Sequence, residues 1–504
     1  MLCFLAVSCK KDSADSESAI SGTLVKPSYN RSSMFRNPLN GWVMYASASG
    51  NPSYWDTQFY VPDLGKTVKA IDYASACYIR TSWRTFNPSD GVYAWRDPGT
   101  AIYKMIKGAQ DKGLPIAFRI VVDGRDQGAN TPQFVFDAGA KYYVANASFP
   151  DRKTPVLQDP IFRKYYSKLI EELAKDFNDL NKTSFVDAYG LGLWGEGHSV
   201  IYEDPNNPSG QNIEVIKEEV IDWISDVYTK NFSKVPLLIN YHRVVGDPAG
   251  NGAPNPNSEK LLNKMINKGY SLRQDAFGMT DYYQSWEKNF AKIWNFKRPI
   301  IMEGGWITTG THRYWTDPSG KYRQDHPEDV RQGEFDSSLE AAVNMMDFRI
   351  GEIESWFTKS FTLCQRFISE GGYRLYPDRV YLPEKVKAGT ETTINHRWRN
   401  MGWGYFPNNI PQWNYKYKVA FALLDEENKV KKIFVDDKGE PSTWLKNNPI
   451  AYELKANVSV PAGNYTWAVA IVDTTNENQP GIRLAVNGDI TSTGWLKLLK
   501  VQVQ

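Results

Sequence analysis

Short apolar runs alternate along most of this chain with longer stretches in which apolar residues recur every three or four positions. The first pattern is typical of buried strands and the second of amphipathic helices. The alternation extends from about residue 31 to residue 372. Because strands that alternate with helices usually form a parallel sheet with helical crossovers, this part is predicted to have an α/β fold.

Eight of the apolar runs have the composition and length of strands: residues 41–47, 77–83, 115–122, 188–194, 235–241, 276–282, 298–303 and 352–357. Amphipathic helical patterns lie between them, most clearly at residues 161–177, 213–229 and 334–348. Eight strands, each followed by a helix, predict a (β/α)₈ barrel, also called a TIM barrel, over residues 31–372.

Two long segments rich in Gly, Pro, Asp and aromatic residues, 123–160 and 307–327, follow the third and the seventh predicted strand. Active sites of such barrels are built from the loops that follow the strands. These two inserts are therefore candidate walls of a substrate site, or else decoration of the surface.

From residue 373 onward the pattern changes to short alternating runs separated by Pro and Gly: residues 392–400, 415–425, 431–437, 451–460, 465–473, 482–486 and 495–503. This spacing predicts an antiparallel β-sandwich as a second domain, over residues 373–504. Its aromatic side chains, among them Trp398, Trp403, Tyr405, Trp413 and Trp444, would either stack on sugars or pack inside the domain and against the barrel.

The N-terminus is a short apolar segment that ends in small residues and a cysteine, Cys9, followed by Lys10, Lys11 and Asp12. It is too short to span a bilayer. The segment resembles the lipobox of exported lipoproteins of the Bacteroides group, although a positively charged start is missing. That resemblance implies a lipid anchor at Cys9 and a place in the bacterial cell envelope; the alternative is a frayed apolar N-terminus. Residues 10–30 are small and polar and read as a flexible tether, so residues 1–30 are separated from the barrel.

Charge and cysteine content exclude several classes of protein. The chain of 504 residues has 59 Lys and Arg against 57 Asp and Glu, a net charge of +2, which argues against a nucleic-acid partner. Of its four cysteines, Cys77 and Cys364 lie in apolar segments, and none forms a close-spaced metal or redox pair. The positions His312, Asp317, Asp325 and His326 match no standard ligand spacing. No Gly-rich phosphate loop or nucleophile elbow is present, and no cofactor or metal is predicted.

Two glutamates are the strongest candidates for chemistry. Glu196 follows the apolar run that ends in Trp194, and Glu303 ends the run 298–303. Both are flanked by glycines, which let a ligand approach the backbone closely. An ionised carboxylate is costly to bury beside apolar residues, so a chain that places two in this way has a use for them.

Paired carboxylates at one barrel mouth are the apparatus of glycoside hydrolysis, in which one acid protonates the leaving oxygen and a second carboxylate attacks or activates water. The retaining reaction needs the carboxyl groups ~5–5.5 Å apart and the inverting reaction ~6.5–9.5 Å. A much larger gap, or an arginine between them, would argue against the retaining form. As an alternative, both glutamates are structural and paired with arginines, for which Arg80 and Arg119 are the candidates.

The arrangement resembles clan A of the retaining glycoside hydrolases over most of residues 37–360. The stretch Tyr78-Ile79-Arg80-Thr81-Ser82-Trp83-Arg84, followed by Asn87-Pro88-Ser89-Asp90-Gly91-Val92-Tyr93-Ala94-Trp95, is similar to the second-strand segment of β-galactosidase-like members. The resemblance implies that Glu196 is the acid/base and Glu303 the nucleophile. Clan members usually have Asn before the acid/base glutamate, where this chain has Gly195.

A second resemblance combines both domains. The string Trp194-Gly195-Glu196-Gly197-His198 and the later Ile482-Arg483-Leu484-Ala485 are similar to a barrel group that carries a C-terminal β-sandwich and is considered glycosidase-like. No substrate is settled for that group. The resemblance supports the same division into a catalytic barrel and an accessory sandwich.

The clan resemblance also implies roles for other residues. Arg80 would orient Glu303 and lower its pKa, Tyr282 or Tyr283 would donate a hydrogen bond to Glu303, and Trp356 would be a sugar platform. The remaining candidates, for stacking or for binding hydroxyls, are Trp194, His198, Asn240, His242, Asp281 and Trp306. The expected function is hydrolysis of a β-linked glycan with retention; the alternative is a non-catalytic glycan-binding lipoprotein on a degenerate barrel.

Overall fold

The computed structural model describes residues 20–47, 51–125, 128–245, 255–278, 282–308 and 320–504. Eight parallel strands form a closed barrel. In chain order they are β3 (Gly41–Ser47), β6 (Ala74–Ser82), β7 (Ile116–Val121), β10 (Thr183–Asp187), β11 (Leu237–Asn240), β12 (Tyr270–Gln274), β13 (Ile300–Met302) and β14 (Met345–Phe348). Pairing of β14 with β3 closes the ring, with Met345 opposite Gly41.

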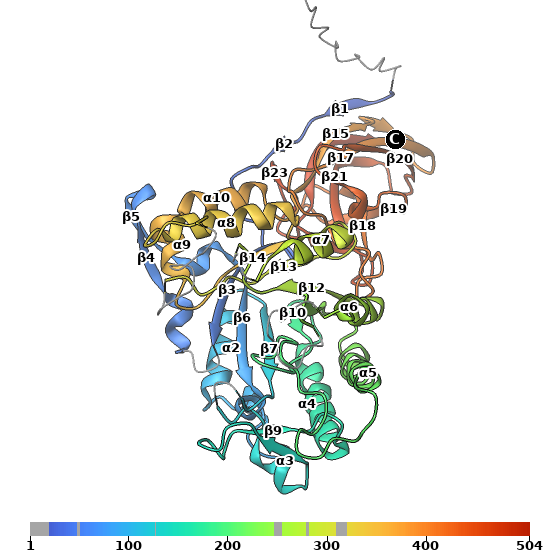
Figure 1. Ribbon diagram of the computed structural model, residues 1–504. Coiled ribbons are helices and arrows are strands. Elements are labelled where there is room, and N and C mark those ends of the chain that lie inside the picture. Colours follow the sequence, from blue (N-terminus) through green and yellow to red (C-terminus); the bar gives the residue numbers. More distant parts are fainter. Residues whose placement is uncertain (1–19, 48–50, 126–127, 246–254, 279–281, 309–319) are drawn as a thin grey trace, which may run out of the picture.

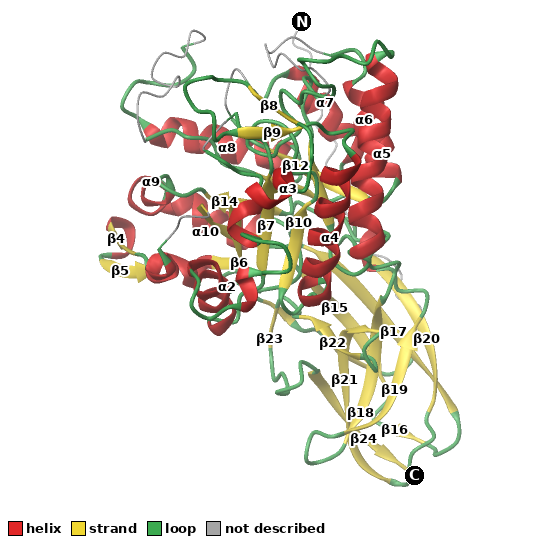
Figure 2. Ribbon diagram, turned by 90° about the horizontal axis from the view of Figure 1, so that it is seen from below, coloured by secondary structure: helices red, strands yellow, loops and turns green. Residues whose placement is uncertain are grey.

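Helices cover the outside of the barrel (Figures 1 and 2). The longer ones are α2 (Ala101–Asp111), α4 (Pro160–Phe177), α5 (Ile213–Asn231), α6 (Ser258–Asn267), α7 (Ser285–Trp294), α8 (Pro327–Glu340), α9 (Ile353–Lys359) and α10 (Phe361–Glu370). Their starts follow ordinary capping chemistry. The side chain of Asp159, for example, accepts hydrogen bonds from the first backbone amides of α4, and Pro160 occupies the first helical position. No helix of the described chain is long and apolar enough to cross a membrane.

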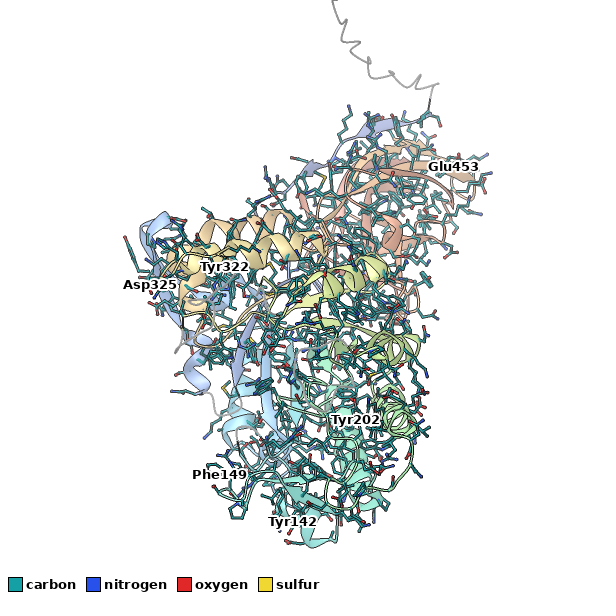
Figure 3. All side chains as sticks on the ribbon, viewed as in Figure 1. Tyr142, Phe149, Tyr202, Tyr322, Asp325 and Glu453 are labelled. Carbon is teal, nitrogen blue, oxygen red and sulfur yellow. The ribbon has the colours of Figure 1, made fainter. Side chains whose placement is uncertain are left out.

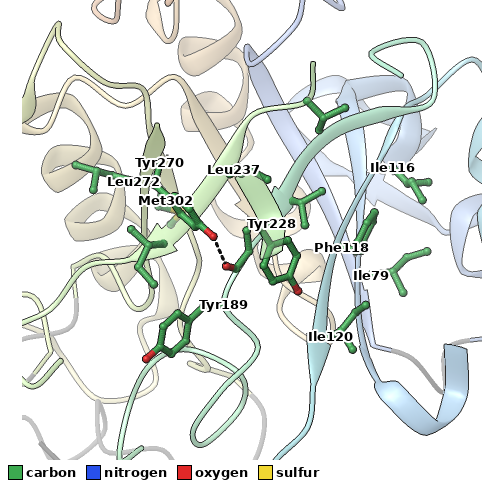
Figure 4. Close-up of a cluster of buried hydrophobic side chains, with 14 of the residues drawn as sticks. Ile79, Ile116, Phe118, Ile120, Tyr189, Tyr228, Leu237, Tyr270, Leu272 and Met302 are labelled. Atoms are coloured by element: carbon green, nitrogen blue, oxygen red, sulfur yellow. Dashed lines mark hydrogen bonds between the residues drawn. The ribbon is translucent and has the colours of Figure 1, made fainter. Parts of the chain in front are cut away.

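The alternation along each barrel strand separates two environments. In β7, Ile116, Phe118 and Ile120 belong to the apolar cluster shared with the surrounding helices, as Figure 4 shows for that cluster. Ala117 and Arg119 point into the barrel, since successive side chains of a strand face opposite ways. A hydrogen bond from the Tyr270 hydroxyl to the carbonyl oxygen of Ala188 (2.8 Å), the dashed line in Figure 4, ties β12 to the chain after β10.

Two sheets, antiparallel except for the pair β16–β24, make up the second domain and include β1 from before the barrel. One has the order β1-β15-β17-β20 and the other β16-β24-β21-β18-β19, with β22 beside β21. Their bounds are β1 (Thr23–Val25), β15 (Leu375–Leu382), β16 (Lys385–Val386), β17 (Glu391–Asn400), β18 (Tyr417–Leu424), β19 (Val430–Asp436), β20 (Ile450–Asn457), β21 (Gly463–Asp473), β22 (Gln479–Ile482) and β24 (Leu496–Val503). Side chains of both sheets share one apolar core, as the predicted sandwich requires.

The sandwich closes the N-terminal end of the barrel. Interior residues near the starts of the strands, such as Val43, Ala76 and Met345, lie in the same apolar cluster as Trp413 and Phe421 of the sandwich. Figure 2 shows the two sheets beyond one end of the barrel. The carboxyl ends of the strands, where TIM barrels have their sites, are therefore at the opposite end.

The aromatic side chains of the second domain are packed rather than displayed. Trp398 and Trp444 are fully buried and stack on each other at 4.8 Å, and Trp403, Tyr405 and Trp413 are 5% exposed or less. The indole nitrogen of Trp403 donates to the carbonyl oxygen of Val343 in the barrel. The packing alternative of the sequence analysis is thus the correct one for these residues.

One predicted strand near the site was misplaced. The fourth strand was predicted at 188–194, but the observed strand, β10, ends earlier, at Asp187. The residues that follow it form a loop. Gly190 and Gly192 have φ values of 73° and 78°, a left-handed conformation that interrupts strand pairing and that glycine adopts easily. The apolar character of this stretch reflects burial of the loop.

Two further strands also begin earlier than predicted. The sixth strand was predicted at 276–282, but the observed strand, β12, ends at Gln274. The eighth was predicted at 352–357, but the observed strand, β14, ends at Phe348. Residues Ile353–Lys359 form helix α9 instead, and the helix predicted at 334–348 ends at Glu340. Apolar runs of this length fit a short strand or a buried helix turn equally well, which explains the error.

The described part of the predicted tether takes part in the sandwich. Residues 1–19, including Cys9, lie outside the described residues. Strand β1 pairs antiparallel with β15, with Leu24 opposite Tyr381, and β2 (Ser28–Tyr29) pairs with β23 (Val486–Asn487). The structure therefore differs from the prediction of a flexible tether at these strands, because β1 completes the edge of one sandwich sheet and β2 forms a two-stranded sheet with β23.

The first insert, 123–160, folds into helix α3 (Gln133–Asp137) and a hairpin of β8 (Tyr142–Val144) and β9 (Lys153–Pro155). Figure 3 labels Tyr142 and Phe149 of this insert at the end of the molecule away from Glu453 of the sandwich. The insert therefore lies beyond the carboxyl ends of the strands. Of the second insert, residues 309–319 lie outside the described residues.

Candidate active site

Glu303 directly follows β13 and its side chain is fully buried. Oε2 accepts hydrogen bonds from Arg119 (2.8 Å) and Arg273 (2.9 Å), and Oε1 accepts one from Arg349 (3.2 Å). These arginines come from β7, from β12 and from the residue after β14. The carboxylate is thus held from three strands of the barrel, which gives it a single orientation.

Glu196 lies in the glycine-rich loop after β10 and is 5% exposed. Its Oε1 accepts a hydrogen bond from Arg119 at 2.8 Å and lies 3.8 Å from a guanidinium nitrogen of Arg80. Gly195 has a φ of 74°, and a Cβ at that position would lie 3.1 Å from Cδ of Arg119. A side chain at this position would therefore require Arg119 to shift slightly.

Arg119 joins the two glutamates. Its Nη1 donates to Glu196 and its Nη2 to Glu303, each over 2.8 Å. The two carboxylates therefore converge on one barrel mouth, as their positions in the sequence predicted. The guanidinium also lies between the two bonded oxygens, which is the arrangement expected to oppose the retaining reaction.

Further buried carboxylates extend this network. Asp187, the last residue of β10, accepts hydrogen bonds from Nε of Arg119 (3.0 Å) and from the hydroxyl of Tyr78 (2.7 Å). Asp347 of β14 accepts one from Arg273 (3.0 Å), and Asp275 accepts one from Arg349 (3.2 Å). The charges are therefore paired across the barrel, as buried charges must be.

The sequence analysis missed most of this network. It did not single out Arg273, Arg349, Asp187, Asp275 or Asp347, and it named Arg119 only as a structural partner. A signal was present, because charged residues two apart, as in Arg273-Gln274-Asp275 and Asp347-Phe348-Arg349, point to the same face of a strand. Charges on the inner face of a barrel strand are expected at its mouth rather than in its packed interior.

The network shifts the pKa values of Glu303 and Glu196 in opposite directions. Burial alone would raise the pKa of Glu303, but the Arg119 and Arg273 guanidiniums outweigh burial and hold that pKa well below its ordinary value. Burial, reinforced by the Asp275 carboxylate, raises the pKa of Glu196 to about 8. The surroundings therefore favour the ionised form of Glu303 and the protonated form of Glu196.

Four predicted site residues lie around Glu196. The imidazole of His242 bonds to the backbone of Glu196, and burial, with His198 nearby, lowers the pKa of His242 to about 3. His198 stacks on Trp194 at 5.5 Å, and both are partly exposed. Arg80 contacts Glu196, whereas the sequence analysis assigned it to Glu303, although its charge also helps to lower the pKa of Glu303.

Two more predicted residues border the network through partners other than the two glutamates. The side-chain oxygen of Asn240 accepts a hydrogen bond from the backbone of Asp275 (3.2 Å). Trp306 is partly exposed, and the guanidinium of Arg349 lies 5.0 Å from its ring. Among the described residues, Trp306 and Trp194 are thus two partly exposed tryptophans near this network, suited to stacking on a sugar face.

The tyrosines predicted to serve Glu303 lie elsewhere. The Tyr283 hydroxyl lies 3.3 Å from that of Tyr241, within the apolar cluster outside the barrel, and Tyr282 packs against a separate small cluster. Asp281 lies outside the described residues. Tyr45 of β3 and Tyr78 of β6 are tyrosines that the Glu303 charge reaches. Burial raises the pKa of Tyr45 to about 12, and the Glu303 charge adds to that rise.

Trp356 is not a sugar platform. It lies on α9, is fully buried, and packs edge-on against Trp42 with ring centroids 4.9 Å apart. The error has the same cause as the misplaced eighth strand, because a run read as a strand end is a helix whose apolar face covers the barrel.

Replacing Trp356 by alanine is expected to lower the free energy of unfolding by about 3–5 kcal/mol, because a large cavity is left in the core. Urea denaturation followed by far-UV circular dichroism measures this loss. Trp306→Ala is the matched control, since Trp306 is partly exposed and its removal leaves no enclosed cavity. Equal denaturation midpoints for Trp356→Ala and the unmodified chain would contradict the assignment of Trp356 to the core.

Neither a known family nor a curated protein matches the sequence. Among solved structures, the β-amylase catalytic domain of Paenibacillus polymyxa is similar with a TM-score of 0.40 at 12% identity, covering 58% of this chain and 90% of that one. The endo-β-1,4-mannanase of Thermotoga petrophila has a TM-score of 0.40 at 10% identity, covering 93% and 98%. Endo-glycoceramidase II of Rhodococcus sp. has a TM-score of 0.35 at 13% identity, and the match covers 85% of this chain and 99% of that one. Similarity at this level concerns the arrangement of the chain and does not specify its chemistry.

Proposed function

We propose that this chain is a glycoside hydrolase in which Glu196 is the proton donor and Glu303 the anionic carboxylate. The observation that carries the proposal is the contrast between the two groups at one mouth, since the pKa of Glu196 is raised to about 8 and that of Glu303 is strongly lowered. Glycoside hydrolysis requires one protonated and one ionised carboxyl group at the same bond.

In the retaining form of the reaction, a Glu303 oxygen attacks the anomeric carbon while the glycosidic bond breaks. Glu196 transfers its proton to the departing oxygen and becomes a carboxylate. It then takes a proton from water, whose oxygen attacks the same carbon and releases Glu303. A β-linked glycan is the substrate class that the clan resemblance implies.

Arg119 sets a condition on this reaction. A sugar that enters between the glutamates has to replace the bonds from Arg119 to Glu196 and Glu303. Arg119 has a further anchor in Asp187, which lies 2.7 Å from Nη2 and 3.0 Å from Nε. We propose that the guanidinium keeps this anchor, deeper in the barrel, while sugar hydroxyls take over its contacts with the glutamates.

The same bridge favours a second candidate, a non-catalytic glycan-binding protein. If Arg119 stays bonded to both glutamates, they are permanently paired structural ions and cannot react. Incubation with a panel of aryl glycosides and of plant, algal and bacterial polysaccharides separates the two candidates. A hydrolase releases aglycone or shortened chains, whereas a binding protein retains some of these glycans and leaves all of them intact.

The pKa of Glu196 predicts the pH dependence of the enzyme. Because protonated Glu196 is the active form, kcat/KM for a glycoside with a poor leaving group is expected to be level below pH about 8 and to fall about tenfold per pH unit above it. Steady-state rates between pH 5 and 10 measure this profile. The control is the same sugar with a dinitrophenyl leaving group, which needs no proton and should show no such fall. A rate with the poor leaving group that keeps rising above pH 8 would exclude Glu196 as the acid.

We also propose that the chain is held at the bacterial cell envelope through a lipid on Cys9. The support is the apolar run that ends in small residues at this cysteine. Replacing Cys9 by serine is expected to move the expressed protein from the membrane fraction to the soluble fraction of the producing cells.

A further inference from the structure

Arg80 differs from the other arginines of the mouth in its access to solvent. Its side chain is 7% exposed, against 1% for Arg119, 0% for Arg273 and 4% for Arg349. It lies within β6, two residues before the strand ends. Arg80 is thus the most exposed of these four arginines.

Arg80 also lacks a close anionic partner. Arg119, Arg273 and Arg349 each have a carboxylate oxygen within 3.2 Å. Over the ranges that the structure describes, the recorded side-chain contact of Arg80 is the ion pair with Glu196 at 3.8 Å, beyond hydrogen-bonding distance.

The unbonded nitrogens of Arg80 are not sealed inside the barrel. Arg273 Nη1 and Arg349 Nε are sealed from solvent without a partner, but no nitrogen of Arg80 belongs to this group of sealed atoms. A guanidinium that is more than nine-tenths buried and still offers free donors is an unusual arrangement, since buried charges are ordinarily paired. Within the described residues no carboxylate lies at hydrogen-bonding distance from Arg80, so its donors are available to an anion that enters the mouth.

We propose that Arg80 binds an anionic group on the substrate, so that the glycan taken by this mouth is acidic, bearing uronic acid carboxylates or sulfate esters. A guanidinium matches both groups with two parallel hydrogen bonds. Because Arg80 lies beside Glu196, the charged substituent would sit close to the glycosidic oxygen that Glu196 protonates. The inference rests on the proposed function, since it names the substrate class of the same site.

The test compares the binding of matched thioglycosides, which are not cleaved at a useful rate, to the full-length chain. The probes are methyl 1-thio-β-glucoside, its 6-sulfate and methyl 1-thio-β-glucuronide, with the same three compounds in the galacto series. Titration by calorimetry or NMR is expected to show at least one charged sugar binding about tenfold or more tightly than its neutral counterpart. Comparison of the glucuronide with the 6-sulfate shows which anion is recognised. The ratio of affinities between charged and neutral sugar should fall as salt is added.

Variants assign this preference to Arg80. Arg80→Gln is expected to abolish the advantage of the charged sugar, and Arg80→Lys to keep part of it. Arg96→Gln, which removes an arginine paired with Glu172 and Asp176 on the outer surface, should change nothing. If Arg80→Gln does not fold, Arg80→Lys decides: a severalfold weaker affinity for the charged sugar alone supports the proposal, and an equal effect on both sugars overturns it.

The proposal is overturned if no charged sugar binds better than its neutral counterpart in either series. It is also overturned if the advantage survives in folded Arg80→Gln. Failure of the hydrolase proposal has a different signature. A chain that cleaves no glycoside but keeps an Arg80-dependent preference for charged thioglycosides would be an acidic-glycan binding protein, and the assignment of Arg80 would stand.

Discussion

Replacing Glu303 by glutamine is expected to reduce the turnover of an aryl glycoside by about 10⁴-fold or more, the scale on which loss of a nucleophile acts. Glutamine keeps the shape of the side chain but has no ionised oxygen to attack the anomeric carbon. The measurement is steady-state release of the aryl group below pH 8, where Glu196 holds its proton. Circular dichroism checks that the variant is folded.

Glu287→Gln is the matched control for Glu303→Gln. Glu287 is also fully buried and also paired with an arginine, Arg243 at 3.1 Å, and it has no recorded contact with Glu196 or Glu303. Its replacement removes a buried carboxylate without touching the proposed chemistry. A normal turnover rate in Glu303→Gln would refute the role of Glu303 as the nucleophile. An equal loss of turnover in Glu287→Gln would show that the effect comes from impaired folding.

Replacing Arg119 by methionine is expected to lower the free energy of unfolding by about 3–5 kcal/mol. The reason is that the carboxylates of Asp187, Glu196 and Glu303 lose a shared partner that lies within 2.8 Å of each. Three buried acids would then face one another without this charge, and the pKa of Glu303 should rise. Urea denaturation followed by far-UV circular dichroism measures this loss, as a shift of the denaturation midpoint relative to the unmodified chain.

Arg96→Met serves as the exposed counterpart. Arg96 also contacts two carboxylates, Glu172 and Asp176, but all three side chains are partly exposed, so the expected change is below ~1 kcal/mol. The double variant Arg119→Met, Glu303→Gln should recover part of the loss, because it removes one of the stranded charges. Unchanged stability in Arg119→Met would show that the bridge is not maintained in solution.

The predicted strand at 41–47 has the bounds of β3, and the runs at 77–83, 115–122, 235–241 and 298–303 contain or overlap β6, β7, β11 and β13. These strands were predictable because they are buried on both faces and read as continuous apolar runs bounded by polar residues. The strands predicted at 188–194 and 352–357 were wrong because an apolar run is not always a strand. Both runs are apolar without being strands, since one is a buried loop and the other a helix against the barrel.

The site shows the same division. Placing Glu196 and Glu303 at one mouth required only the order of the strands, and the structure brings them together as expected. The partners of these glutamates could not be read in the same way. Arg119 and Glu303 are 184 positions apart in the sequence, and which buried arginine meets which carboxylate depends on the stagger of strands around the barrel.

The sequence by itself determined the barrel, the sandwich and the two glutamates, because the composition and spacing of strands can be read from local stretches of the chain. Only the tertiary structure decided that Trp356 is core, that Arg119 joins Glu196 to Glu303, and that Arg80 is left without a close anion. These facts depend on distances across the barrel, where burial removes water and makes each charge depend on the partner that the fold brings within reach.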